Sequence, residues 1–172
     1  MIRLLGTLLV LGASFWLGAY FSMKEKYRLQ ELEQLEKGMI YLQGQIRYLS
    51  ATLAEALADV GWKMEGVIGE IFLKAAENLA EKQGDSAEEV WSNVWREEKG
   101  KTFLITEDVN TLLQFGRSLG YLDKMQQENS ISLFLRYVEL ALEQGRKRQE
   151  KNGRLYYGMG GLCGLLVVVT LL

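Results

Sequence analysis

Paired carboxylates are the residues of this sequence that could perform acid–base catalysis or bind a metal ion. They occur at Glu88–Glu89, Glu97–Glu98 and Glu107–Asp108. Adjacent residues point in different directions around a helix, and none of these pairs lies in a loop with the ligand spacing of a calcium-binding EF-hand. We therefore interpret them as solvated helix surface, or as first-turn charges that complement the positive end of a helix dipole.

Other residue types that carry chemistry are scarce. The 172 residues include no histidine, and Cys163 is the only cysteine. His-containing catalytic triads and Cys/His zinc sites are therefore excluded within the chain. The sequence also lacks a Gly-rich phosphate-binding loop of the GxGxxG or GxxxxGKS/T type. We expect a protein that is not an enzyme and that binds no cofactor.

Negative charge is concentrated in the middle of the chain. Eight acidic residues and four basic residues lie between Glu81 and Asp108, whereas the segments beside the two ends are basic. An acidic surface held away from anionic lipid would remain available to a soluble partner. The alternative is a solvated face that only keeps the domain soluble. The candidate residues of a partner interface are Glu88, Glu89, Glu97 and Glu98.

Apolar residues recur at helical spacing through the middle of the chain, and no period-two pattern of a strand competes with them. The stripe from Leu29 to Val60 predicts one long helix. We predict an all-α fold in which an antiparallel bundle of about five helices is flanked by transmembrane helices. A coiled-coil dimer is the alternative interpretation of the first stripe. Three tryptophans at helical positions are interpreted as core: Trp62, Trp91 and Trp95.

Several residues indicate where helices begin and end. Ser86 and Glu89 have the S-x-x-E spacing of a capping box, and Thr106 is a candidate N-cap. Gly120 is expected to stop one helix and Asp123 to cap the next, which makes this segment a structural turn.

Both ends of the chain are apolar and long enough to cross a membrane. No charged residue occurs from Leu4 to Met23, and about 20 residues of helix match the roughly 30 Å hydrocarbon core of a bilayer. We expect transmembrane helices at 4–23 and 155–172, with a helical domain and a charged juxtamembrane stalk at 24–154. Close helix packing within the spans is predicted at Ser14, Gly18, Ser22, Gly160 and Gly164.

Basic residues flank both spans on the side of the central domain. Lys24, Lys26 and Arg28 follow the first span, five basic residues in 146–154 precede the second, and Arg3 alone lies on the far side. The positive-inside rule then places the domain in the cytoplasm and both termini outside. Anionic lipid, rather than nucleic acid, is the expected partner of the 146–154 cluster. A cleaved signal peptide is the alternative for the first span, but bulky aromatic residues stand where cleavage needs small ones.

Stretches spread over nearly the whole chain match a known family. They are Arg3–Gly6, Leu32–Leu42 with Ile46–Tyr48, Leu112–Gln127 and Tyr156–Leu172, of which the Leu119–Asp123 turn is the most specific. On these stretches the sequence resembles the stage III sporulation protein AB family of endospore-forming bacteria. That family in turn resembles the cytoplasmic domain of the inner-membrane platform proteins of type II secretion and type IV pilus systems.

The resemblance implies a scaffold in the mother-cell membrane, within the channel complex between mother cell and forespore. Its implied partners are a cytoplasmic secretion-type ATPase and neighbouring membrane subunits. The alternative function is a membrane-tethered adaptor or regulator that binds one soluble protein. A homo-oligomer is compatible with both functions.

Overall fold

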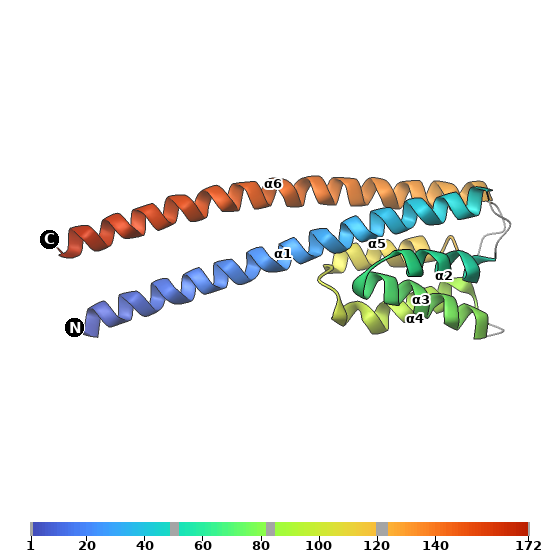
Figure 1. The fold of residues 1–172 in the computed structure, drawn as a ribbon, viewed down its shortest axis with the longest axis horizontal. Coiled ribbons are helices and arrows are strands. Elements are labelled where there is room, and N and C mark those ends of the chain that lie inside the picture. The colour runs from blue at the N-terminus through green and yellow to red at the C-terminus, as the bar shows by residue number, and fades with distance from the viewer. Residues whose placement is uncertain (1, 49–51, 82–84, 120–123, 172) are drawn as a thin grey trace. The chain divides into compact units, whose positions relative to one another are not determined.

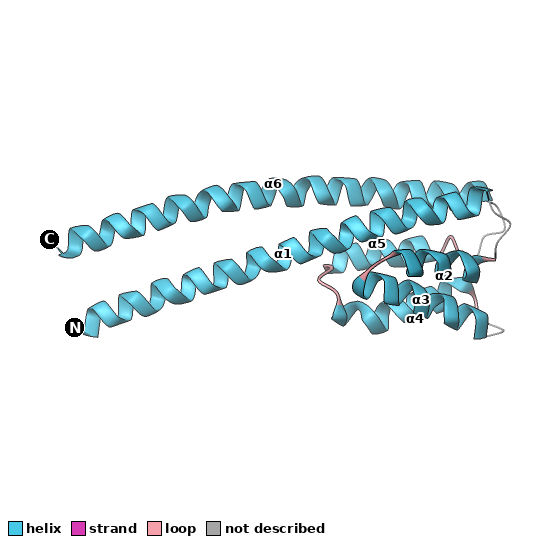
Figure 2. Ribbon diagram, in the orientation of Figure 1, coloured by secondary structure: helices cyan, strands magenta, loops and turns pink. Residues whose placement is uncertain are grey.

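The computed structural model describes residues 2–48, 52–81, 85–119 and 124–171, and side chains are described at 20, 23–48, 52–81, 85–119 and 125–151. The elements are helical throughout these ranges, which confirms the all-α prediction (Figures 1 and 2). They are α1 (Ile2–Tyr48), α2 (Leu53–Lys63), α3 (Gly66–Glu81), α4 (Ala87–Glu98), the 3-10 turn η1 (Lys99–Lys101), α5 (Thr106–Gly116) and α6 (Lys124–Leu171).

The chain divides into two compact units. Met1–Lys26 and Glu143–Leu172 form one, called the terminal unit below, and Tyr27–Leu142 forms the other, called the bundle. Within the described residues, no helix is both long and apolar enough to cross a membrane. The side chains of the predicted packing residues Ser14, Gly18, Ser22, Gly160 and Gly164 lie outside the described part of the chain.

The first helix ends before the predicted stripe does. We predicted one helix as far as Val60, but α1 ends at Tyr48 and α2 begins after Thr52. Thr52 and Glu55 form a capping box, in which Glu55 N donates to Thr52 Oγ1 at 3.3 Å and Thr52 N donates to the Glu55 carboxylate at 2.8 Å. These bonds satisfy the amides at a new helix start. Because α2 continues the apolar spacing, the stripe could not distinguish one helix from two.

The bundle core draws apolar side chains from all of its helices. Trp91 lies at its centre, edge-on to both Phe72 and Phe115 with ring centroids 5.5 Å apart in each case. Its indole Nε1 donates to Leu112 O at 2.8 Å, so the one polar atom of the ring is satisfied. Further fully buried residues are Leu32, Leu35, Met39, Leu42, Leu57, Val60, Ile68, Ile71, Trp95 and Ile131.

Two of the three tryptophan predictions are confirmed. Trp91 and Trp95 are buried in the core, whereas Trp62 is 79% exposed and its assignment to the core was wrong. Trp62 lies on the face of α2 opposite Leu57 and Val60, the residues that pack inward. Size and hydrophobicity alone did not reveal which face of α2 carries it.

The predicted starts of α4 and α5 had different outcomes. The Ser86 capping box is confirmed, since Glu89 N donates to Ser86 Oγ at 3.2 Å and Ser86 N donates to Glu89 Oε2 at 3.0 Å. Thr106 is not the N-cap of α5, because Ile105 occupies that position and its N–H donates to Asp108 Oδ2 at 2.9 Å. Gly120 and Asp123 lie outside the described residues.

The contact between Gly116 and Trp91 gives a test of the core packing. A Cβ at position 116 would collide with the Trp91 indole, so Gly116→Ala should lower the free energy of unfolding by about 1–3 kcal/mol through overpacking. Gly100→Ala is the matched control, because nothing lies within 4 Å of a Cβ there. Denaturant unfolding of the detergent-solubilised chain, followed by tryptophan fluorescence, measures both. Equal effects of the two variants would contradict this packing.

Candidate functional site

The predicted interface residues lie on or at the end of α4, but they differ in environment. The side chains of Glu88 and Glu97 are 49% and 62% exposed. Glu89 is exposed as well, and its carboxylate accepts the Ser86 N–H of the capping box. Glu98 is only 8% exposed as a residue, so its interpretation as a solvated charge is wrong. It follows Trp95 by three positions, which places it on the inward face of α4.

A lysine of α3 connects the two carboxylates at the end of α4. Lys74 Nζ lies 2.9 Å from Glu97 Oε2 and 2.7 Å from Glu98 Oε1, and Lys101 Nζ lies 2.6 Å from Glu98 Oε2. The hydrogen bonds to Glu98 and then to Glu97 raise the pKa of Lys74. Those from Lys101 and then Lys74 lower the pKa of Glu98. Glu98 is therefore committed to joining α4 to its neighbours, which leaves Glu88 and Glu97 as the projecting carboxylates.

The most strongly connected polar group of the bundle is Asp108, in the first turn of α5. Arg28 of α1 donates to both of its oxygens, from Nε at 2.7 Å and from Nη2 at 2.8 Å. Tyr137 Oη of α6 donates to Oδ1 at 2.7 Å, and the Ile105 N–H donates to Oδ2. Asp108 is 1% exposed and Arg28 is 5% exposed. Three helices far apart in the sequence thus meet at one carboxylate, which we call the Asp108 cluster.

The Asp108 cluster is held in its charged state. Burial, the largest influence, raises the pKa of Asp108, but the hydrogen bonds from Arg28, Tyr137 and the Ile105 N–H together outweigh it and lower the pKa. Burial and the bond to Asp108 raise the pKa of Tyr137. A carboxylate that already accepts four hydrogen bonds has little capacity left to accept a proton from a substrate or to bind a metal ion. Its role is to join helices.

Arg28 and Asp108 also correct two expectations. We counted Arg28 among the basic residues that flank the first span, but its guanidinium is buried against Asp108. We interpreted Asp108 as a solvated or first-turn charge, and it does complement the start of α5, yet it is buried. The sequence signal was present as Asp at the third position of α5. What the sequence lacked was any indication that an arginine 80 residues away would pair with it.

A second contact joins α1 to the segment before α5. Phe103 N donates to Glu31 Oε2 at 2.7 Å, and the ring of Phe103 stacks on Tyr27 with centroids 4.9 Å apart. Burial raises the pKa of Glu31 to about 7. The hydrogen bonds from the Phe103 and Leu104 amides lower this pKa, and the charge of Asp108 raises it further. Glu31 therefore takes up a proton near neutral pH.

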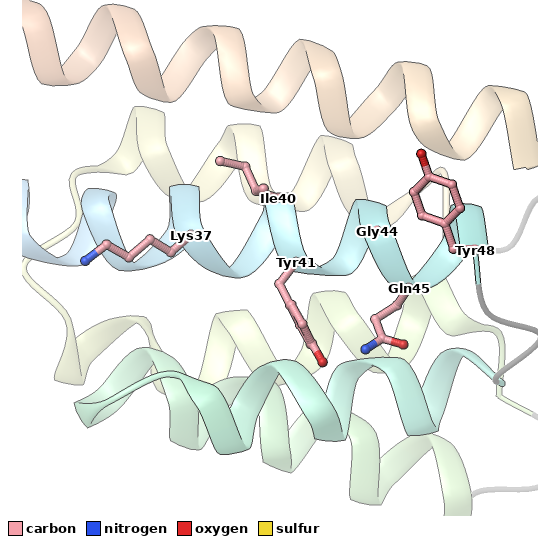
Figure 3. Close-up of a pocket in the computed structure, with 6 residues that line it drawn as sticks. All are labelled: Lys37, Ile40, Tyr41, Gly44, Gln45 and Tyr48. Atoms are coloured by element: carbon pink, nitrogen blue, oxygen red, sulfur yellow. The ribbon is translucent and has the colours of Figure 1, made fainter.

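An open groove runs along α1 on another side of the bundle (Figure 3). It has a volume of about 670 Å³ and is lined by Lys37, Ile40, Tyr41, Gly44, Gln45 and Tyr48. Tyr41 and Gln45 extend toward α2, whereas Ile40 and Tyr48 extend to the opposite side (Figure 3). The lining combines the lysine and two tyrosines with apolar surface and contains no carboxylate. Across the described residues, no cluster of three His, Cys, Asp or Glu side chains could hold a metal ion.

Comparisons with known proteins agree with one another. The family model described as stage III sporulation protein AB matches residues 3–172. The stage III sporulation protein AB of Bacillus subtilis (strain 168) is 27% identical over 174 residues, which cover 100% of both chains. A solved structure of stage III sporulation protein AB (SpoIIIAB) shares the fold with a TM-score of 0.68 and 23% identity, over 73% of this chain and 98% of that chain.

The Asp108 cluster predicts a large effect of removing one charge. Asp108→Asn removes the carboxylate charge that the buried Arg28 guanidinium binds through two hydrogen bonds, which should cost about 3–5 kcal/mol of unfolding free energy. The exposed pair of Lys74 and Glu97 is the comparison, because Glu97→Gln should cost at most about 1 kcal/mol. Denaturant unfolding of the solubilised chain measures both variants. The double variant Arg28→Met with Asp108→Asn should recover part of the loss. A cost for Asp108→Asn no larger than that for Glu97→Gln would contradict the cluster's role.

Proposed function

The chain belongs to the stage III sporulation protein AB family, and on that premise we propose that it is a membrane-anchored scaffold subunit of the channel complex between mother cell and forespore. In this proposal the bundle stands in the mother-cell cytoplasm and docks a secretion-type ATPase, while the ends of the chain contact neighbouring membrane subunits. The observation that carries the proposal is a helical bundle whose polar clusters are devoted to joining helices, placed between two long apolar ends.

Anchoring at both ends is supported by sequence and backbone together. The uncharged stretches 4–23 and 155–171 belong to helices α1 and α6, and a helix satisfies its backbone hydrogen bonds within itself, as a bilayer core requires. The positive-inside argument loses Arg28, which is buried. It retains Lys24 and Lys26 and the five basic residues of 146–154, so the cytoplasmic assignment of the bundle stays favoured.

Thiol labelling tests the proposed topology. In a Cys163→Ser background, Glu88→Cys introduces a single thiol at an exposed position of α4. A membrane-impermeant thiol reagent should leave intact cells unlabelled and should react after permeabilisation, because the bundle is proposed to be cytoplasmic. The Cys163→Ser chain without the new thiol is the control. Labelling of intact cells would overturn the cytoplasmic assignment.

The proposed ATPase contact is the acidic surface of α4. Glu88 and Glu97 project from this helix, and each forms an ion pair near the surface. Arg117 Nε lies 3.7 Å from Glu88 Oε1. Glu97 pairs with Lys74, whose side chain is 39% exposed. Exposed ion pairs of this kind are weak and can be exchanged for those of a partner at little cost. A charged surface of this type contributes mainly to the rate and specificity of association.

Charge reversal tests the contact on α4. Glu88→Lys with Glu97→Lys should weaken ATPase binding about tenfold at low salt and flatten its salt dependence, while exposed substitutions leave the fold intact. Glu65→Lys with Glu139→Lys, at exposed positions elsewhere, changes the net charge equally and is the control. Wild-type affinity of the first variant across a salt titration would exclude α4 as the contact. A bundle that binds one soluble protein in a 1:1 complex without other membrane subunits would favour the adaptor function instead.

A further inference from the structure

Helices α2, α1 and α6 form a layer in which α1 lies between the other two. Gln45 and Tyr41 of α1 contact Asp59 and Lys63 of α2: the amide lies 3.4 Å from the Asp59 carboxylate, and Lys63 Nζ lies 3.7 Å from the Tyr41 ring centroid. On its other side, Gln43 Nε2 donates to Ser132 Oγ of α6 at 3.1 Å. One face of the layer packs into the core through residues such as Leu42, Val60 and Phe134. We call the opposite face the open face (Figure 3).

The open face carries an unusual number of exposed apolar side chains. On α1, Ile40, Gly44 and Tyr48 are four residues apart and form one stripe. On α6, Leu133 and Leu140 are seven residues apart and lie opposite the core residues of that helix. The exposed fractions are 55% for Ile40, 78% for Tyr48, 79% for Trp62, 70% for Met125, 71% for Leu133 and 50% for Leu140.

The size of this surface indicates a protein partner. If roughly 200 Å², a value typical of aromatic residues, is taken for each large side chain, the six exposed fractions correspond to a total area of about 800 Å², spread over α1, α2 and α6. Isolated monomers rarely expose a patch of more than about 300–600 Å². A standard interface buries about 800 Å² on each partner. The open face is therefore large enough for a stable contact between two chains.

The geometry of the open face points to a second copy of this chain as the occupant. Trp62 and Leu133 lie on opposite sides of α1, and each is one residue from a contact with it, at Lys63 and Ser132 respectively. They therefore lie at the same height along α1. A two-fold axis that runs along α1, in front of the open face, brings α6 of one copy over α2 of the other. Trp62 of each copy then contacts Leu133 of the other, so the contact occurs twice in the dimer.

The α1 helices at the centre of this dimer can also pack against each other. The axis places the Ile40, Gly44 and Tyr48 stripes of the two copies against each other, and nothing lies within 4 Å of the position where a Gly44 Cβ would stand. A glycine at this point allows the backbones of the two α1 helices to approach closely. Isologous contacts of this kind close on themselves, so they produce a dimer and not an open chain.

The charges of the open face and the direction of the two α1 helices favour a second copy of the chain over other partners. Lys37 and Arg136 on the open face are accompanied by the acidic Glu33 and Glu128, so the face does not select a partner of one sign of charge. The two α1 helices run in the same direction in this arrangement, as two chains anchored in one membrane require. That last point rests on the proposed anchoring. We propose that the chain forms a parallel, two-fold symmetric dimer through its open face.

Cross-linking of the full chain in native membranes tests the dimer. In the Cys163→Ser background, Ile40→Cys should give a product of twice the monomer mass with a short bis-maleimide, because position 40 lies beside its own copy across the axis. Asn93→Cys, exposed on α4, is the matched control and should give at least about fivefold less product. Two differently tagged chains, one with Trp62→Cys and one with Leu133→Cys, should cross-link to each other.

The outcomes separate the alternatives. Adding Leu133→Glu to the Ile40→Cys chain should reduce the dimer product about tenfold, since a charge would then face Trp62 of the second copy. A product of another mass at position 40 would show a different protein on the open face and overturn the proposal. Monomer alone, or equal yields at positions 40 and 93, would overturn it as well. None of these results depends on ATPase binding, so the proposed function is tested separately.

Discussion

The fold of the bundle depends on the burial of one carboxylate. Asp108 begins α5, neutralises Arg28 from α1 and accepts the hydroxyl of Tyr137 from α6. A buried charge is costly unless every partner is in place, so these helices must be positioned together or not at all. The contact of Glu31 and Tyr27 with Phe103 lies beside this cluster and directs the chain from η1 into α5.

The buried charged side chains of the bundle serve to join its helices. Three of its buried polar side chains, Arg28, Asp108 and Glu98, are engaged with one another or with lysines and backbone amides. What the described part of the bundle presents outward is instead two surfaces of different chemistry. The surface of α4 is acidic and hydrated, whereas the open face of α2, α1 and α6 is apolar. The scaffold proposed above, with a soluble partner and a second copy of the chain, requires two such distinct surfaces.

Much of the secondary structure could be predicted because its causes are local. The Ser86 capping box involves residues three positions apart, and the apolar spacing around Trp91 and Trp95 marks a helix that buries one face. The same local rules failed where one apolar pattern fits two different arrangements of helices. The stripe that ends at Val60 is continuous in sequence, although the Thr52 capping box begins a second helix within it.

The sequence by itself determined the all-helical class, the family and the absence of histidine and of phosphate-binding loops. These follow from composition and from patterns a few residues long. Only the tertiary structure decided that Arg28 and Asp108 are buried partners, that Glu98 is directed inward and that Trp62 is directed outward. Each of these depends on which helix lies against which. That choice is set by packing between residues as far as 89 positions apart, which no local spacing records.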